Sequence, residues 1–143
     1  MERFKCPIGV FLLLMENNNI YLQLRKNCSF AGMYGAIGGH IDGGETIANA
    51  IIREAKEEVG IDINPQDLQM ATMCHSNAGG KEYLQFFYIC KVWSGKLTNM
   101  EIDKCERIDL FDITALPDNI VPYLATALNK IKSGVTFFED GFE

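Results

Sequence analysis

The sequence lacks the features of a membrane-spanning or exported chain. Its longest uninterrupted apolar run covers only residues 10–15, whereas a membrane-spanning helix needs roughly 18 apolar residues or more. The first residues, MERFKCPIG, carry charge and have neither the apolar core nor the small-residue cleavage site of a signal peptide. These absences predict a cytoplasmic protein that is not associated with a membrane.

Metal-binding patterns of cysteine and histidine are also missing. The chain has five cysteines at wide spacings, no CxxC motif and only two histidines. This composition disfavours a zinc site. It predicts reduced, mostly buried thiols, as is usual for cytosolic proteins, and no pattern supports a catalytic cysteine. The cysteines are Cys6, Cys28, Cys74, Cys90 and Cys105.

Positive charge is in deficit. The chain has 13 Lys and Arg against 19 Asp and Glu, which gives a net charge of −6. A phosphate backbone repels such a protein unless basic residues gather on one face, and the sequence shows no such face. Bulk nucleic-acid binding is therefore disfavoured. A small anionic substrate remains compatible if metal ions supply the local positive charge.

The sequence does have the composition and patterning of a folded domain. Hydrophobic residues make up 48% of the 143 residues and charged residues 22%, which predicts one domain over residues 1–143. The predicted strands cover residues 8–15, 20–25, 70–76, 82–93 and 107–111, and the predicted helices cover residues 46–59 and 118–132. The first two strands form a hairpin, the glycine-rich residues 30–44 form short strands and turns, and the tail at 135–143 either docks or frays. The pattern predicts an α+β fold, a mixed sheet with helices on its faces.

The first predicted helix carries three glutamates on one face. Glu54, Glu57 and Glu58 are spaced i, i+3 and i+4, opposite the apolar residues. Carboxylates this close raise one another's pKa unless a cation compensates, and hard divalent ions prefer such oxygen ligands. Arg53 lies one turn before Glu57 and can pair with it. A solvated acidic surface is the alternative interpretation.

A glycine-rich loop leads into this helix and favours the binding interpretation. Glycines allow the backbone N–H and C=O groups to approach a ligand closely. Glu45 stands at the start of the helix, where its carboxylate can accept hydrogen bonds from the first amides.

Residues 38–61, GGHIDGGETIANAIIREAKEEVGI, resemble the Nudix box. The family pattern is Gly, five residues, Glu, seven residues, Arg-Glu, an apolar residue, any residue, Glu-Glu, any residue, Gly and an apolar residue. Every specified position matches, although Ala55 is small for its apolar place. The matching residues are Gly39, Glu45, Arg53, Glu54, Ala55, Glu57, Glu58, Gly60 and Ile61. The resemblance implies the family's α/β/α sandwich with a mixed sheet between helices, and residues 93–122 are similar to stretches of MutT-like members.

The resemblance implies hydrolysis of a nucleoside diphosphate linked to another moiety, with Mg²⁺ or Mn²⁺ as cofactor. Divalent ions cancel phosphate charge and acidify bound water. The implied metal ligands are Glu54, Glu57, Glu58 and the backbone carbonyl of Gly38. Arg53, Glu54 and Glu57 are the implied catalytic residues of the box, with Arg53 orienting the glutamates and Glu54 also fitting a base. Gly39 is implied to adjoin the substrate, and Glu45 to brace the corner between loop and helix.

Three residues outside the box are further candidates. Glu101, in the loop after the long strand, fits a metal ligand or general base by similarity to MutT-like members, or a solvated loop acid. Arg25, at the end of the second strand, fits a phosphate contact or a surface arginine. Asn119, at the start of the last predicted helix, fits a contact to the base or a helix N-cap. One aromatic side chain can stack on a base, and the residues considered for this role are Phe86, Phe87, Tyr88 and Trp93.

Several functions remain open on the sequence alone. A nucleoside triphosphate is the favoured substrate, and ADP-ribose, another nucleotide sugar, a dinucleotide or a capped RNA end are alternatives. A non-catalytic Nudix-fold binding module is a second class, although such modules commonly lose box glutamates and all are present here. The isoprenoid diphosphate isomerase branch fits poorly, because it is usually longer and needs a catalytic cysteine. Both a monomer and a homodimer are compatible with the sequence.

Overall fold

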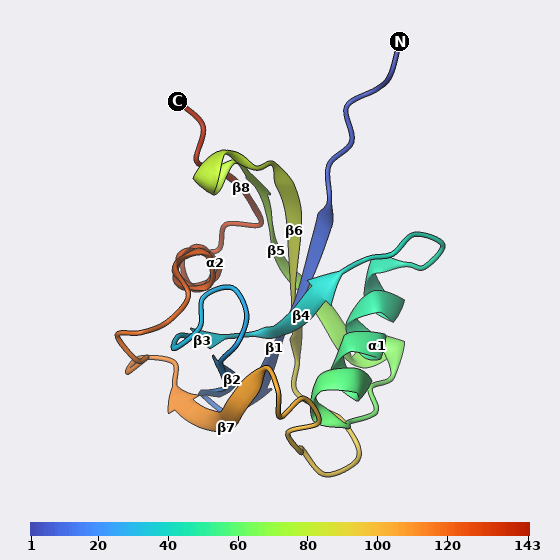
Figure 1. Ribbon diagram of the computed structural model, residues 1–143. Coiled ribbons are helices and arrows are strands. Elements are labelled where there is room, and N and C mark those ends of the chain that lie inside the picture. The colour runs from blue at the N-terminus through green and yellow to red at the C-terminus, as the bar shows by residue number, and fades with distance from the viewer.

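The computed structural model describes residues 1–143. Its strands are β1 (Ile8–Glu16), β2 (Asn19–Arg25), β3 (Tyr34–Gly35), β4 (Ile37–His40), β5 (Leu68–Ser76), β6 (Tyr83–Cys90), β7 (Cys105–Asp112) and β8 (Phe137–Asp140). β1 lies in the middle of a mixed sheet (Figure 1), parallel to β6 on one edge and antiparallel to β4 on the other. β5 continues the sheet antiparallel to β6, and β8 is added parallel to β5.

The hairpin predicted from the first two strands forms only around its turn. β2 pairs with β1 through Met15–Ile20 and Glu16–Asn19. Beyond that point β4 occupies the edge of β1, from Gly9 to Leu12. β2 therefore diverges and pairs along its length with β7, and briefly with β3. The glycine-rich segment thus supplies the two short strands β3 and β4, as predicted.

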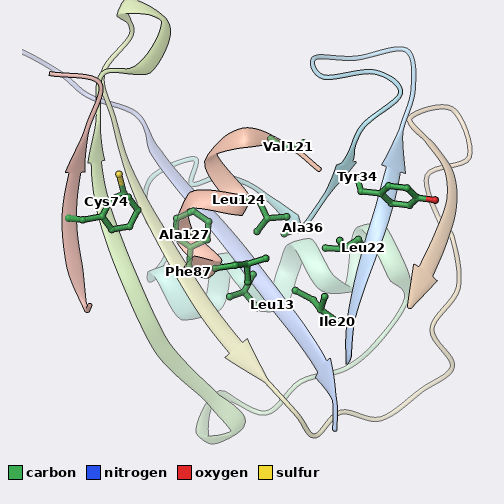
Figure 2. Close-up of a cluster of buried hydrophobic side chains, with 12 residues drawn as sticks. Leu13, Ile20, Leu22, Tyr34, Ala36, Cys74, Phe87, Val121, Leu124 and Ala127 are labelled. Carbon is green, nitrogen blue, oxygen red and sulfur yellow. The ribbon is translucent and has the colours of Figure 1, made fainter. Parts of the chain in front are cut away.

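Two helices cover opposite faces of the sheet (Figure 1). They are α1 (Ile47–Val59) and α2 (Pro122–Lys132). Alternation along β1 serves both faces, because Val10 and Leu14 pack in the core beneath α1 while Leu13 packs in the core beneath α2. Figure 2 shows the second core, in which Leu124 of α2 lies near Leu13 and Phe87. The predicted α+β sandwich is confirmed.

One helix has its predicted bounds and the other does not. The Thr46 side chain accepts a hydrogen bond from an amide of the first turn of α1, and Gly60, with φ +72°, ends this helix. α2 begins at Pro122, four residues later than predicted. Val121 is held in an extended conformation, as is usual for a residue that precedes proline. Asn119 consequently lies before the helix and does not cap it.

The C-terminal segment docks onto the sheet. β8 pairs with β5, and Phe138 is buried in the core beneath α2. The long central strand β6 ends at Cys90, three residues before its predicted end at Trp93. Two short 3₁₀ helices, η1 (Pro65–Asp67) and η2 (Ala78–Gly80), flank β5.

The cysteines agree with the prediction of reduced and mostly buried thiols. All five are free, three are buried, and Cys6 and Cys28 are half-buried. None of the helices combines the length and the apolar character that crossing a membrane would require.

Candidate active site

The backbone of β4 lies directly against the glutamates of α1. A Cβ atom on Gly39 would lie 2.5 Å from Oε1 of Glu54, and one on Gly38 would lie 2.2 Å from the carbonyl oxygen of Val10. Neither position has room for a side chain. The two glycines therefore let a strand backbone and a helix carboxylate meet in contact, which is the close approach that their place in the sequence predicts.

Arg53 organises the acidic side chains around it. Its guanidinium donates to both carboxylate oxygens of Glu45, at 2.8 and 3.1 Å, and to Glu54 at 2.9 Å. The predicted pair with Glu57 is present but longer, at 3.4 Å. Hydrogen bonding to Glu45 and Glu54 raises the pKa of Arg53, and the Arg53 guanidinium in turn lowers the pKa of Glu45. The arginine thus fixes three carboxylates while remaining charged.

Glu45 does not cap α1, which its place at the start of the helix would have allowed, and instead takes the bracing position that the resemblance implied. Thr46, not Glu45, caps α1, because the Thr46 hydroxyl accepts from the amide of Asn49. The Glu45 carboxylate instead binds Arg53 and accepts from the backbone amide of Asp42, at 3.4 Å. It links the loop before α1 to the second turn of the helix, as a brace would.

Glu58 is buried, and so it does not lie opposite the apolar residues of α1, as was predicted for all three glutamates. Its side chain accepts from Nε2 of Gln23 at 3.0 Å and from the backbone amide of Gly38 at 3.2 Å. Burial, then the neighbouring Glu54 carboxyl, raises the pKa of Glu58 to about 9. Glu57, by contrast, has 53% of its side-chain surface exposed. The acidic cluster therefore runs from the solvent inward to the edge of the core.

The donor set suits a hard divalent cation. The cluster offers carboxylate oxygens only, and a cation beside Glu58 would relieve the cost of ionising its buried carboxyl. The close contact of Gly39 with Glu54 shows that the backbone reaches these oxygens. No three Asp, Glu, His or Cys side chains are already gathered to hold an ion at once. Glu54 is bonded to Arg53, and Glu58 is bonded to Gln23 and Gly38.

Glu101 lies near this cluster, as a loop residue after β6. It is half-buried, and its negative charge contributes to the raised pKa of Glu58. The side chain of Asn99 accepts a hydrogen bond from the Glu101 amide, while the Glu101 carbonyl accepts from the amides of Lys104 and Cys105. The loop is thus held in place by its own backbone contacts.

A cleft of about 300 Å³ opens next to the cluster, on the α2 side of the sheet. Gly38 and Gly39 form part of its lining, and Arg25 lines it as well. The Arg25 guanidinium donates to the carbonyl and the hydroxyl of Ser29, at 2.7 and 3.1 Å. Asn119 does not line the cleft, because its side chain donates to the Gly32 carbonyl at 3.0 Å. The structure therefore brings Arg25 and Gly39 to the cleft and leaves Asn119 outside it.

The aromatic residues of the cleft differ from those considered on the sequence. Phe11, Phe30, Tyr83 and Tyr123 line it, whereas none of the four aromatic residues between positions 86 and 93 does. The sequence could have indicated Phe30 as a ligand contact, because it is a large aromatic residue in a glycine-rich loop. Phe11 and Tyr123 could not be recognised in this way, because each belongs to an apolar pattern that is typical of a core strand or helix.

Comparisons with known proteins agree with this arrangement. The chain matches the family model of the NUDIX domain over residues 6–130. An 8-oxo-dGTP diphosphatase of Escherichia coli is 28% identical over 129 residues, which are 90% of this chain and 97% of that protein. An ADP-ribose pyrophosphatase of Methanocaldococcus jannaschii is 29% identical over 110 residues, which are 77% of this chain but 64% of that protein. The chain thus spans less than two thirds of the length of the archaeal relative.

A solved structure shows the same fold. The crystal structure of a MutT NUDIX hydrolase from Burkholderia pseudomallei superposes with a TM-score of 0.80 and 25% sequence identity, covering 88% of this chain and 98% of that chain. The family model spans most of the chain and includes both the glycine strand and the acidic helix. The chain therefore belongs to the NUDIX family, as a MutT-like member.

Proposed function

We propose that this chain acts as one domain over residues 1–143 and hydrolyses the diphosphate bond of a nucleoside triphosphate. Pyrophosphate bonds are the bonds on which hydrolases of this family act. The observation that carries the proposal is the position of Gly38 and Gly39, which line the cleft and contact the glutamates of α1. A nucleotide in the cleft would thus have its phosphates next to the acidic cluster.

Mg²⁺ or Mn²⁺ is the cofactor in this proposal. Glu54, Glu57, Glu58 and the carbonyl of Gly38 would hold it, since all are hard oxygen donors. When bound, such an ion neutralises phosphate charge and acidifies a water molecule. The buried Glu58 supports this assignment, because a carboxyl whose pKa is about 9 becomes a good anionic ligand only beside a positive charge.

The chain's own residues would position the reacting groups. Arg53 keeps Glu54 and Glu57 in fixed rotamers through its hydrogen bonds, and positioning of this kind contributes much of the rate in phosphate chemistry. Glu54 and Glu101 are the two candidate bases. Glu54 contacts the glycine strand, and Glu101 lies close enough to influence the pKa of Glu58.

Arg25 and Gly39 are the proposed substrate contacts. Arg25 lines the cleft, and its guanidinium can bind phosphate oxygens if it exchanges its bonds to Ser29. Gly39 offers backbone without a side chain at the junction of cleft and cluster. A contact from Asn119 to the base stays a prediction, and it would require this side chain to leave the Gly32 carbonyl.

ADP-ribose is the second candidate substrate, because one relative is an ADP-ribose pyrophosphatase. The cleft volume of about 300 Å³ is at the lower end of the roughly 300–1,000 Å³ of small-molecule sites. That size favours a ligand with one nucleoside and no second bulky group. The full set of box glutamates supports an enzyme over a non-catalytic binding module.

The proposal is tested by incubating the purified protein with Mg²⁺ and a panel of nucleotides. The panel holds the common nucleoside triphosphates, 8-oxo-dGTP and ADP-ribose, and the release of phosphate and pyrophosphate is measured. We expect release of a nucleoside monophosphate and pyrophosphate from at least one triphosphate, abolished by chelation of the metal. Tight binding without turnover across the whole panel would contradict the proposal and favour the binding module.

A further inference from the structure

A buried glutamine in the cleft has no partner within the protein. Gln85 of β6 is only 8% exposed and lines the cleft, yet its carboxamide makes no hydrogen bond to another residue. Gln23, the other buried glutamine, donates to Glu58 at 3.0 Å. Its amide atoms keep contact with solvent, because Thr72 Oγ1 is the only buried side-chain polar atom without a hydrogen-bond partner. The donors and the acceptor of the Gln85 carboxamide are therefore free to bond a ligand in the cleft.

The neighbours of Gln85 on the sheet are small. It lies opposite Gly9 of β1 and Cys74 of β5. A Cβ atom on Gly9 would lie 3.1 Å from the ring of Phe11 and 3.8 Å from Cγ of Gln85. The absence of a side chain at Gly9 thus lets the ring of Phe11 pack against the strand next to Gln85, and all three residues line the cleft.

Aromatic rings form the walls around this floor. The Tyr123 ring lies 5.2 Å from the ring of Phe11 and 5.7 Å from that of Phe30, between ring centroids. Phe30 has φ +57°, a left-handed conformation that bulky residues rarely adopt, and its side chain remains 44% exposed. The strained backbone at Phe30 thus places an aromatic ring at the cleft, where a planar heterocycle can stack on it.

We propose that Gln85 is the residue that selects the base of the substrate, an inference that rests on the proposed function. Its carboxamide would donate one hydrogen bond and accept another along one edge of a nucleobase. A side-chain amide carries a donor and an acceptor side by side, and nucleobase edges present the complementary pair. The aromatic walls hold the ring by stacking, and the amide supplies the directional contacts that stacking lacks.

The test compares Gln85→Met with Gln69→Met. Methionine keeps the length of the side chain and removes its hydrogen bonds, and Gln69 is an exposed residue on the neighbouring strand β5. We measure kcat/KM for nucleoside triphosphates and for ribose 5-triphosphate, which carries no base. Gln85→Met should lower kcat/KM roughly 10- to 100-fold for its best nucleotide, with little change for ribose 5-triphosphate, while Gln69→Met should resemble the wild type.

The melting temperature separates this role from a structural one. Gln85→Met should not lower it, because the amide makes no hydrogen bond within the protein. An equal loss for the base-free substrate, a loss that follows a lower melting temperature, or nucleotide kinetics like those of the wild type would each overturn the proposal.

A binding measurement keeps this inference separate from the proposed function. In ¹⁵N-labelled wild-type protein without metal, adding a nucleoside should shift the side-chain amide resonances of Gln85. If the shift occurs and no nucleotide is hydrolysed, the proposed function fails and the role of Gln85 stands. If no nucleoside or nucleotide shifts these resonances, the role of Gln85 is overturned even where hydrolysis is observed.

Discussion

The two sides of the sheet differ in how their polar side chains are satisfied. On the α1 side, Arg53 holds Glu45 and Glu54, and Glu58 accepts hydrogen bonds from Gln23 and from a backbone amide. On the α2 side, Gln85 lies in the cleft without a partner. The α1 group is bonded within the protein before a ligand arrives, whereas the Gln85 amide, in a cleft where Arg25 is already bonded to Ser29, is free to bond a ligand. The difference suggests that one side is built to position groups and the other to recognise them.

The largest expected effect is on the α1 side, from Glu57→Gln. This side chain is exposed, so its replacement should leave the stability nearly unchanged. Turnover with Mg²⁺ should fall roughly 10²-fold or more, because the side chain that we propose as a metal ligand loses its charge. Glu139→Gln, at an exposed position on β8, is the matched control and should retain activity. Near-normal turnover by Glu57→Gln would refute the ligand assignment.

Gly39→Ala tests the contact between β4, which lines the cleft, and Glu54 of α1. The new Cβ would lie 2.5 Å from Oε1 of Glu54, and relief of such overpacking costs about 1–3 kcal/mol of unfolding free energy. Urea denaturation measures this loss, and turnover should fall along with it. Combining Gly39→Ala with Glu54→Ala should recover part of the lost stability. Strictly additive losses would show that the two residues do not press on each other.

Gln23→Leu tests the comparison directly through stability. It removes a hydrogen bond to the buried carboxyl of Glu58 and should cost about 1–3 kcal/mol of unfolding free energy. Gln85→Met, in the cleft, should cost nothing by the same measurement. Equal losses of unfolding free energy for Gln23→Leu and Gln85→Met would show that the two glutamines do not differ in their hydrogen bonding within the protein.

Tyr34→Phe should cause the smallest change in unfolding free energy. It measures how much a hydrogen-bonded polar pair outside the site contributes to stability. The Tyr34 hydroxyl donates to Asp109 at 2.5 Å and lowers the pKa of that carboxyl. A depressed carboxyl pKa stabilises the fold at neutral pH, and this contribution is lost as the pH falls through the folded-state value. Tyr34→Phe should cost about 1 kcal/mol at pH 7, and the difference from wild type should narrow below the ordinary carboxyl pKa of 3.8. A difference independent of pH would contradict this account.

The acidic helix could be predicted from the sequence because its information is local. Apolar periodicity defined α1, and the spacing of the box identified its glutamates, whereas the capping residue Thr46 was not identified. The burial of Glu58 was missed, although a signal existed: Ile51, Ala55 and Glu58 follow one another at i, i+4 and i+7, which places Glu58 in the apolar stripe of the helix. Its four-residue spacing from Glu54, which equally indicates a shared acidic face, concealed this.

The cleft could not be predicted, because it depends on contacts between distant segments. Gly9 and Gln85 meet only through the parallel register of β1 with β6, which no local pattern specifies. Tyr123, in the first turn of α2, lines the cleft together with residues of β1 and of the loop before β3. Two of the three proposed substrate contacts, Arg25 and Gly39, do line the cleft. Arg25 lies on a strand whose range was predicted, and Gly39 lies in the glycine-rich segment for which only short strands and turns were predicted.

The contact between Gly39 and Glu54 sets a minimum length for a productive ligand. Gly39 lines the cleft and lies against Glu54 with no side chain between them. If the proposed function holds, a nucleoside would bind in the cleft and pyrophosphate, with its metal ion, beside the glutamates, and the two would not compete. Joining them in one molecule should raise the affinity well beyond that of either fragment, since the second half binds at a high effective concentration.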